Sequence, residues 1–193
     1  MTTRACQPVP PLSHAGVGKM RLKNATSKVF QSALKTAQYT GSIEIVIAEE
    51  TNLQEEISDY ISRNENAWTF SANDLPKSPA AFWQGIANGI GDVEQSNRNK
   101  MVNVIRHLKK VGGECLFIIS DAQELSSMIM GSLTNVSSLK VIGLVFIGNR
   151  KIGTRLRQSN VSYTTSYIDN IEQENGPASS DRMLTPQKAI FRD

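Results

Sequence analysis

Apolar residues along the middle of the chain follow two spacings that alternate. Runs such as SIEIVIA (42–48) and CLFII (115–119) are continuously apolar or rich in β-branched residues, which is typical of buried strands. Between such runs, apolar residues recur every three or four positions, as they do along one face of a helix. The predicted strands are 42–48, 67–71, 115–119, 141–147 and 161–168, and the predicted helices cover 29–37, 53–61, 82–90, 101–111, 125–133 and 154–158.

This alternation predicts an α/β domain of three layers, in which a parallel sheet carries helices on both faces. Glycines mark two helix ends, because Thr40-Gly41 follows the first predicted helix and Gly112-Gly113 stops the helix at 101–111. Residues 1–23 and 171–193 mix Pro, Gly, Ser and basic residues without periodicity. We therefore expect a flexible N-terminal arm and a flexible C-terminal tail around one domain, residues 24–170.

The composition narrows the class of protein. At 193 residues with 39% hydrophobic and 20% charged residues, the chain suits one globular domain and is too polar for a membrane protein. Its longest apolar run, 141–147, is far shorter than the roughly 20 residues of a spanning helix, and the N-terminus has no apolar signal segment. Cys6 and Cys115 are interpreted as free thiols. These features predict a cytoplasmic protein.

Charge is distributed unevenly, although the net formal charge is only +3. Residues 95–113 and 125–168 contain no acid, and their basic residues form a candidate patch for an anion or a protein partner. The patch consists of Arg98, Lys100, Arg106, Lys109, Lys110, Arg150, Lys151, Arg155 and Arg157, with Lys140 in the same acid-free segment. Residues 44–59 are the opposite, with six acids and no base: Glu44, Glu49, Glu50, Glu55, Glu56 and Asp59.

Ligands of open parallel sheets bind at the carboxyl ends of the strands, so the turns after the predicted strands are the places to look for a site. The stretch ECLFIISDAQEL (114–125), followed by GLVFIGNRKIGTRL (143–156), resembles the second half of a group of AAA-type P-loop ATPases. That group includes the bacterial ATPases of general secretion and type IV pilus biogenesis, the N-terminal domain of the cell-division protein DamX, and transposition ATPases. The resemblance spans about residues 26–168 in order and implies a P-loop NTPase-like fold.

The resemblance assigns candidate roles to three positions. Ser120 and Asp121 stand where such ATPases have the Walker B aspartate, which organises magnesium, and the acid that orients the attacking water. Asn149 matches the polar sensor position after the next strand. Because Ser120 carries no charge, Asp121 and Asn149 are vestigial candidates. We favour a structural interpretation, in which Asp121 is a helix N-cap and Asn149 is a turn residue.

The first strand departs most from the family pattern. A phosphate loop needs glycines, so that backbone N–H groups converge on phosphate, and a lysine. After Ala48 this chain reads EETNLQEEISDY, which has neither and would repel a triphosphate. SHAGVGKM (13–20) looks like the end of a Walker A motif, but Ser13 and Met20 replace essential residues and PVPP (8–11) stands where the strand belongs.

No catalytic set emerges elsewhere in the sequence. His14 and His107 are too isolated for a metal site or a catalytic base, and no Gly-x-Ser-x-Gly motif is present. We therefore expect no cofactor, no metal and no catalysis. Three hypotheses stay open: a pseudo-ATPase that binds another protein, such as an active relative or a second copy of itself; a nucleic-acid-binding accessory factor for transposition or an SOS-type response; and a weak ATPase whose phosphate loop is residues 13–20.

Overall fold

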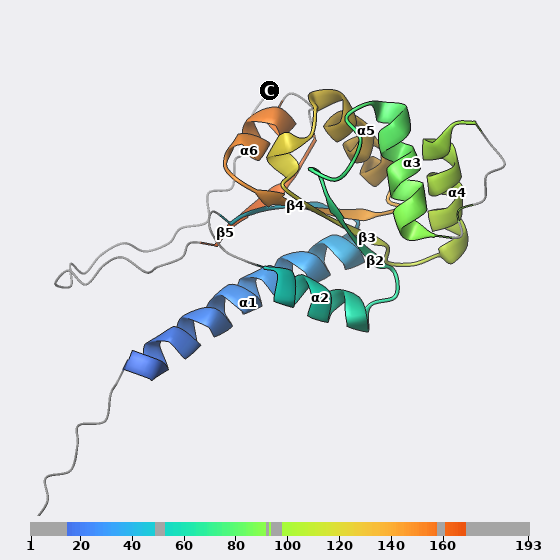
Figure 1. Cartoon of the computed structure of the whole chain (residues 1–193). Coiled ribbons are helices and arrows are strands. Elements are labelled where there is room, and N and C mark those ends of the chain that lie inside the picture. The colour runs from blue at the N-terminus through green and yellow to red at the C-terminus, as the bar shows by residue number, and fades with distance from the viewer. Residues whose placement is uncertain (1–14, 49–52, 92, 94–97, 158–160, 169–193) are drawn as a thin grey trace, which may run out of the picture.

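The computed structural model describes residues 15–48, 53–91, 93, 98–157 and 161–168, with side chains from residue 27 onward. Its elements follow the predicted alternation (Figure 1). They are α1 (Ala15–Thr40), β1 (Ile43–Ile47), α2 (Gln54–Arg63), β2 (Ala67–Ser71), α3 (Pro79–Ile90), α4 (Lys100–Val111), β3 (Leu116–Ser120), the 3-10 helix η1 (Ala122–Glu124), α5 (Ser127–Ser138), β4 (Gly143–Gly148), α6 (Lys151–Leu156) and β5 (Thr164–Tyr167).

The five strands form one sheet in the order β2-β3-β4-β1-β5, and every neighbouring pair is parallel. Helices α1 and α2 cover one face, and α3, α4, α5 and α6 lie on the other (Figure 1). This is the three-layer α/β arrangement that the sequence predicts. The strands alternate their side chains between the two faces, so that Ile43, Ile45 and Ile47 join the core under α3 and α5, whereas Val46 joins the core under α1 and α2.

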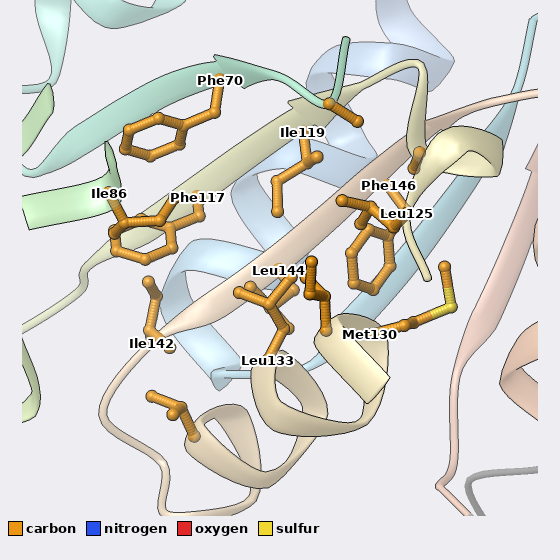
Figure 2. Close-up of a cluster of buried hydrophobic side chains, with 14 of the residues drawn as sticks. Phe70, Ile86, Phe117, Ile119, Leu125, Met130, Leu133, Ile142, Leu144 and Phe146 are labelled. Atoms are coloured by element: carbon orange, nitrogen blue, oxygen red, sulfur yellow. The ribbon is translucent and has the colours of Figure 1, made fainter. Parts of the chain in front are cut away.

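The larger core lies between the sheet and α3 to α6 (Figure 2). Phe117 of β3 stands at its centre, and its ring packs edge-to-face against Phe70 of β2 with a centroid distance of 5.3 Å. Leu125, Met130 and Leu133 cover the same face from the η1–α5 side. This packing fixes the ends of β3 and β4, where the candidate site residues lie.

Local signals set the helix ends. Gly41 has a φ of +61° and Gly112 a φ of +68°, so both use the left-handed backbone that glycine adopts at little cost, and α1 and α4 end there as predicted. Pro79 opens α3. At α5 the Oγ of Ser126 accepts a hydrogen bond from the backbone N of Ile129 at 3.3 Å.

Helices α1, α3 and α6 begin at least three residues earlier than the sequence predicts, α3 at Pro79 rather than at residue 82. Helix α1 begins at Ala15, so residues 15–23, which we assigned to an irregular arm, have helical backbone. Their glycines and basic residues give no apolar period, so the sequence carried no sign of this helix. Helix α6 covers Lys151–Leu156 rather than 154–158, because the side chain of Asn149 starts the turn sooner. Residues 1–14 and 169–193 lie outside the described part of the chain, as do most residues of the polar loop at 92–98.

Candidate functional site

The neighbouring strands β1 and β4 are the point where the connections of the sheet diverge: the chain runs from β1 to β2 at one edge and from β4 to β5 at the other. The helix after β1, α2, lies on one face, and the helix after β4, α6, lies on the other (Figure 1). Such a divergence opens a crevice between the two strands, and ligands of open α/β sheets bind there. A hollow of about 570 Å³ occupies this place. Its lining residues are Ala48, Asp121, Gln123, Gly148, Asn149, Arg150 and Lys151.

Asp121 enters this crevice from the end of β3 with an unusual backbone. Its φ of 52° and ψ of 32° place a non-glycine residue in the left-handed region, which aspartate tolerates better than most residues. The Oγ of Ser71, at the end of the neighbouring strand β2, donates a long hydrogen bond of 3.5 Å to Asp121 Oδ2. Asp121 holds the N-cap position of η1, but its side chain makes no capping bond, so our prediction that it satisfies backbone groups as an N-cap is wrong.

Ser120, which the sequence resemblance aligns with the Walker B aspartate, makes a structural contact. Ser120 ends β3 and pairs with Ser71 in the register of β2 and β3. Its Oγ donates a hydrogen bond of 3.5 Å to the backbone oxygen of Phe70. A hydroxyl that carries no negative charge, and whose proton points to a neighbouring strand, provides no charged ligand for a magnesium ion.

Asn149 forms the turn between β4 and α6. Its Oδ1 accepts a hydrogen bond from the backbone N of Lys151 at 3.0 Å, which is the structural role expected of a turn residue. Its own backbone N donates to Gln123 Oε1 at 3.4 Å. The structure thus brings Asp121 and Asn149 to one hollow, with Gln123 between them. Gln123 belongs to the stretch 114–125 that carries the family resemblance, but the sequence assigned it no role.

The basic residues near α6 differ in what they do. The guanidinium of Arg150 lies over the ring of Tyr167, 6.0 Å from its centroid, at the ends of β4 and β5. Arg155 instead donates a hydrogen bond to the backbone oxygen of Leu125, so it ties α6 to the start of α5. Arg150 and Lys151 therefore line the crevice, and Arg155 does not.

The candidate basic patch is divided in space. Arg98, Lys109 and Lys110 are exposed around α4, which packs beside α3 at one end of the helical layer (Figure 1). Arg150, Lys151 and Arg157 lie around α6, which packs beside α5 at the other end. The nine residues do not form one continuous face, because α3 and α5 lie between their two halves.

The segment between β1 and α2 is only partly described. Residues 49–52 (EETN) lie outside the described residues, and α2 begins at Gln54 after the N-cap residue Leu53. Its first turn carries Glu55 and Glu56. A helix N-terminus attracts anions through its free N–H groups. In α2 the two carboxylates of the first turn already place negative charge there, which disfavours a further anion.

The other sequence candidates give no second site. Residues 15–20 of the Walker-like stretch SHAGVGKM are helical, so Gly16, Gly18 and Lys19 lie within α1 rather than in a loop. Among the described residues, no group of three or more His, Cys, Asp or Glu side chains is placed to hold a metal ion. Cys115 is buried as a free thiol, and burial raises its pKa. Within the same described ranges, no helix is both long and apolar enough to cross a membrane.

These features define an α/β protein with a P-loop NTPase-like fold. No protein-family model and no curated protein match the sequence. Solved structures do match the fold. Cdc6p from Pyrobaculum aerophilum superposes with a TM-score of 0.52 at 9% identity over 82% of this chain and 47% of that one. The Aeropyrum pernix ORC2 protein, in ADPNP–ADP complexes, gives 0.50 at 10% identity over 83% and 49%.

A third match is a chain in the Drosophila ORC bound to GC-rich DNA and Cdc6, with a TM-score of 0.54 at 9% identity over 80% of this chain and 30% of that one. This protein therefore spans less than half the length of each of these three chains. The matches show that it has the fold of AAA-type P-loop ATPases.

Proposed function

We propose that the chain is a non-catalytic, P-loop-like module that acts through protein interaction or regulation, that is, a pseudo-ATPase. One observation carries the proposal: between β1 and α2, where a phosphate loop belongs, the sequence has Glu49 and Glu50 and neither glycine nor lysine. Without glycines the backbone N–H groups cannot converge on phosphate, and without lysine its charge is not neutralised. The carboxylates add repulsion of about 1 kcal/mol per pair even in water.

Ser120, at the end of β3, supports the same proposal. Magnesium at a nucleotide site is held by carboxylates together with the phosphates, so its affinity falls when both partners are lost. Asp121 retains a carboxylate at the next position, but its backbone is left-handed and Ser71 contacts its side chain. These features support a crevice that lacks the charged groups needed to hold a nucleotide and its magnesium ion.

The partner of such a module is proposed to be another protein, either an active ATPase relative or a second copy of this chain. The crevice offers Arg150 and Lys151 beside the carboxylate of Asp121, a mixed set of charges that suits polar contacts with a protein surface. The fold neighbours support this choice, since one of them is described as an ORC complex that holds Cdc6.

Thermal unfolding with millimolar Mg²⁺ and ATP tests the loss of nucleotide binding. Stabilisation by a ligand is RT ln(1 + [L]/Kd), so the melting temperature is expected to stay unchanged. A rise of several degrees that depends on magnesium would overturn the proposal. The interaction is tested by capture of partners with the wild type and with Arg150→Ala/Lys151→Ala. The matched control is Lys109→Ala/Lys110→Ala on α4, which removes the same charge at a distance from the crevice.

A nucleic-acid-binding accessory factor is the second candidate function. The observation that favours it is the number of basic residues in acid-free stretches of the chain. The fold neighbours include ORC bound to DNA, and this is a property of those proteins. A gel shift at low and at physiological salt decides whether this chain binds nucleic acid at all, because phosphate contacts weaken as salt rises.

A further inference from the structure

Helix α1 is much longer than the part of it that packs on the sheet. It runs for 26 residues, from Ala15 to Thr40. Among its side chains that the structure describes, from residue 27 onward, those that join the core are Phe30, Ala33, Leu34 and Ala37. Figure 1 shows the N-terminal half extending away from the body of the domain. At 1.5 Å per residue, the stretch from residue 15 to residue 29 adds roughly 20 Å of helix.

This projecting half is basic and contains no acid. The first acidic residue of the whole chain is Glu44, and the 43 residues before it carry six basic ones: Arg4, Lys19, Arg21, Lys23, Lys28 and Lys35. Four of the six fall between positions 15 and 29. Acid-free basic arms and helices are typical electrostatic contacts for nucleic acid.

The helical period places these four positions on two opposite sides. Successive residues turn by about 100°, so positions 19 and 23 share one side, and positions 21 and 28 share the side opposite. A helix that lies on a membrane has its basic residues on one side and a large apolar face on the other. Basic positions on two opposite sides of the helix instead suit a place between two negatively charged walls.

The major groove of duplex DNA is such a place. It is about 12 Å wide, admits one α-helix and has a row of phosphates along each side. We propose that the projecting half of α1 binds duplex DNA in the major groove, with positions 19 and 23 toward one phosphate row and positions 21 and 28 toward the other. This inference is independent of the proposed loss of nucleotide binding, because the crevice takes no part in it.

The test is fluorescence anisotropy of the full chain with a labelled duplex of 20 base pairs, from 50 to 200 mM salt. Lys19→Gln/Arg21→Gln/Lys23→Gln removes three charges from the projecting half of α1. The control, Arg98→Gln/Lys109→Gln/Lys110→Gln, also removes two lysines and one arginine, but from the exposed surface around α4. The first variant is expected to lose at least about tenfold in affinity, and its slope of log K against log salt should flatten by about 2.7. The control should lose less than about threefold.

Several results would overturn the proposal. The wild type must bind the duplex at 50 mM salt, with a salt slope of about −3.6 for four phosphate contacts. An equal loss of affinity in the α4 control would show that only net charge matters. Binding of a 20-nucleotide single strand as tightly as the duplex would exclude the groove geometry. Binding to phosphatidylserine vesicles without binding to DNA would assign the helix to a membrane surface. Equal melting temperatures of the three proteins establish that lost binding is not lost folding.

Discussion

The side-chain oxygen of Gln123 lies too close to Gly148 for residue 148 to carry a Cβ atom. An ideal Cβ built on Gly148 would come within 2.0 Å of Gln123 Oε1 and 2.9 Å of Ile152 Cδ1. The same oxygen accepts the hydrogen bond from the backbone N of Asn149. A glycine at the end of β4 therefore lets η1 approach the turn that forms the floor of the crevice.

Gly148→Ala is expected to lower the free energy of unfolding by about 1–3 kcal/mol, because either Gln123 leaves its hydrogen bond or the turn shifts. Denaturant unfolding measures the effect. Gly131→Ala in α5 is the matched control, since a Cβ there meets nothing within 4 Å and alanine favours a helix over glycine by up to about 1 kcal/mol. If both variants unfold at or above the wild-type denaturant concentration, the contact between Gln123 and Gly148 does not constrain the turn.

The strands were predictable because each carries its own signal. Buried parallel strands such as β1 and β3 read as nearly continuous apolar runs. The edge strand β2, whose aromatic residues and Thr69 favour a strand, has the same bounds, 67–71, as the sequence predicts. Helix starts depend on weaker signals. The projecting half of α1 has no apolar period, and α6 begins early because of a side-chain bond from Asn149 that spacing does not reveal.

The candidate site was predictable only in part. Asp121 and Asn149 follow strands that end at the same edge of the sheet, so their convergence on one hollow follows from a parallel sheet. The contact between Ser71 and Asp121 depends on β2 lying beside β3, which no local pattern determines. The same limit applies to Arg155, whose partner, the Leu125 carbonyl, lies 30 residues earlier in the chain.

Tyr60→Phe tests a buried polar contact that joins α1 to α2. The Tyr60 hydroxyl donates to Gln38 Oε1 at 2.5 Å, and Gln38 Nε2 donates to the backbone oxygen of Glu114 at 2.8 Å. Removal of the hydroxyl leaves the Gln38 oxygen buried without this donor, at a cost of about 1–3 kcal/mol. Tyr39→Phe on α1, next to Gln38, is the control, because Tyr39 is 61% exposed. We expect its unfolding free energy to stay within about 0.5 kcal/mol of the wild type.

Glu44 makes the stability depend on pH. Its side chain is 3% exposed in β1. Burial raises its pKa, which hydrogen bonds from Ser42 and Thr164 lower in part. Below the ordinary glutamate pKa the folded and unfolded chains are both protonated, and the residue costs no stability. As pH rises from the ordinary glutamate pKa to the raised pKa of the folded state, the unfolded chain loses this proton first, so stability is lost across that window.

Glu44→Gln is therefore expected to match the wild type at low pH and to unfold at a higher denaturant concentration than the wild type at pH 7 to 8. Unfolding curves of both proteins from pH 4 to pH 8 measure the difference. Glu65→Gln removes an exposed carboxyl and should follow the wild-type profile. A gap between Glu44→Gln and the wild type that closes as pH rises would contradict the assignment.

Ser120→Asp asks whether one restored carboxylate is enough to recover nucleotide binding. The variant places a charge at the end of β3, where the ATPases that this sequence resembles have their Walker B aspartate. We expect no change in melting temperature with Mg²⁺ and ATP, because the phosphates would still meet Glu49, Glu50 and Glu55 in place of glycines and a lysine. Even a Kd equal to the ATP concentration would stabilise the fold by only about 0.4 kcal/mol.

Differential scanning fluorimetry measures the change in melting temperature. It compares the wild type, Ser120→Asp and Ser120→Ala, each with Mg²⁺ alone and with Mg²⁺ and ATP. Ser120→Ala controls for the lost hydrogen bond to Phe70, so that any shift specific to aspartate reports charge. A shift with ATP that Lys19→Ala abolishes would mean that residues 15–20 leave α1 and that the stretch 13–20 holds phosphate. The loss would then lie in magnesium binding alone, and the proposed pseudo-ATPase would be an ATPase with a relocated phosphate loop.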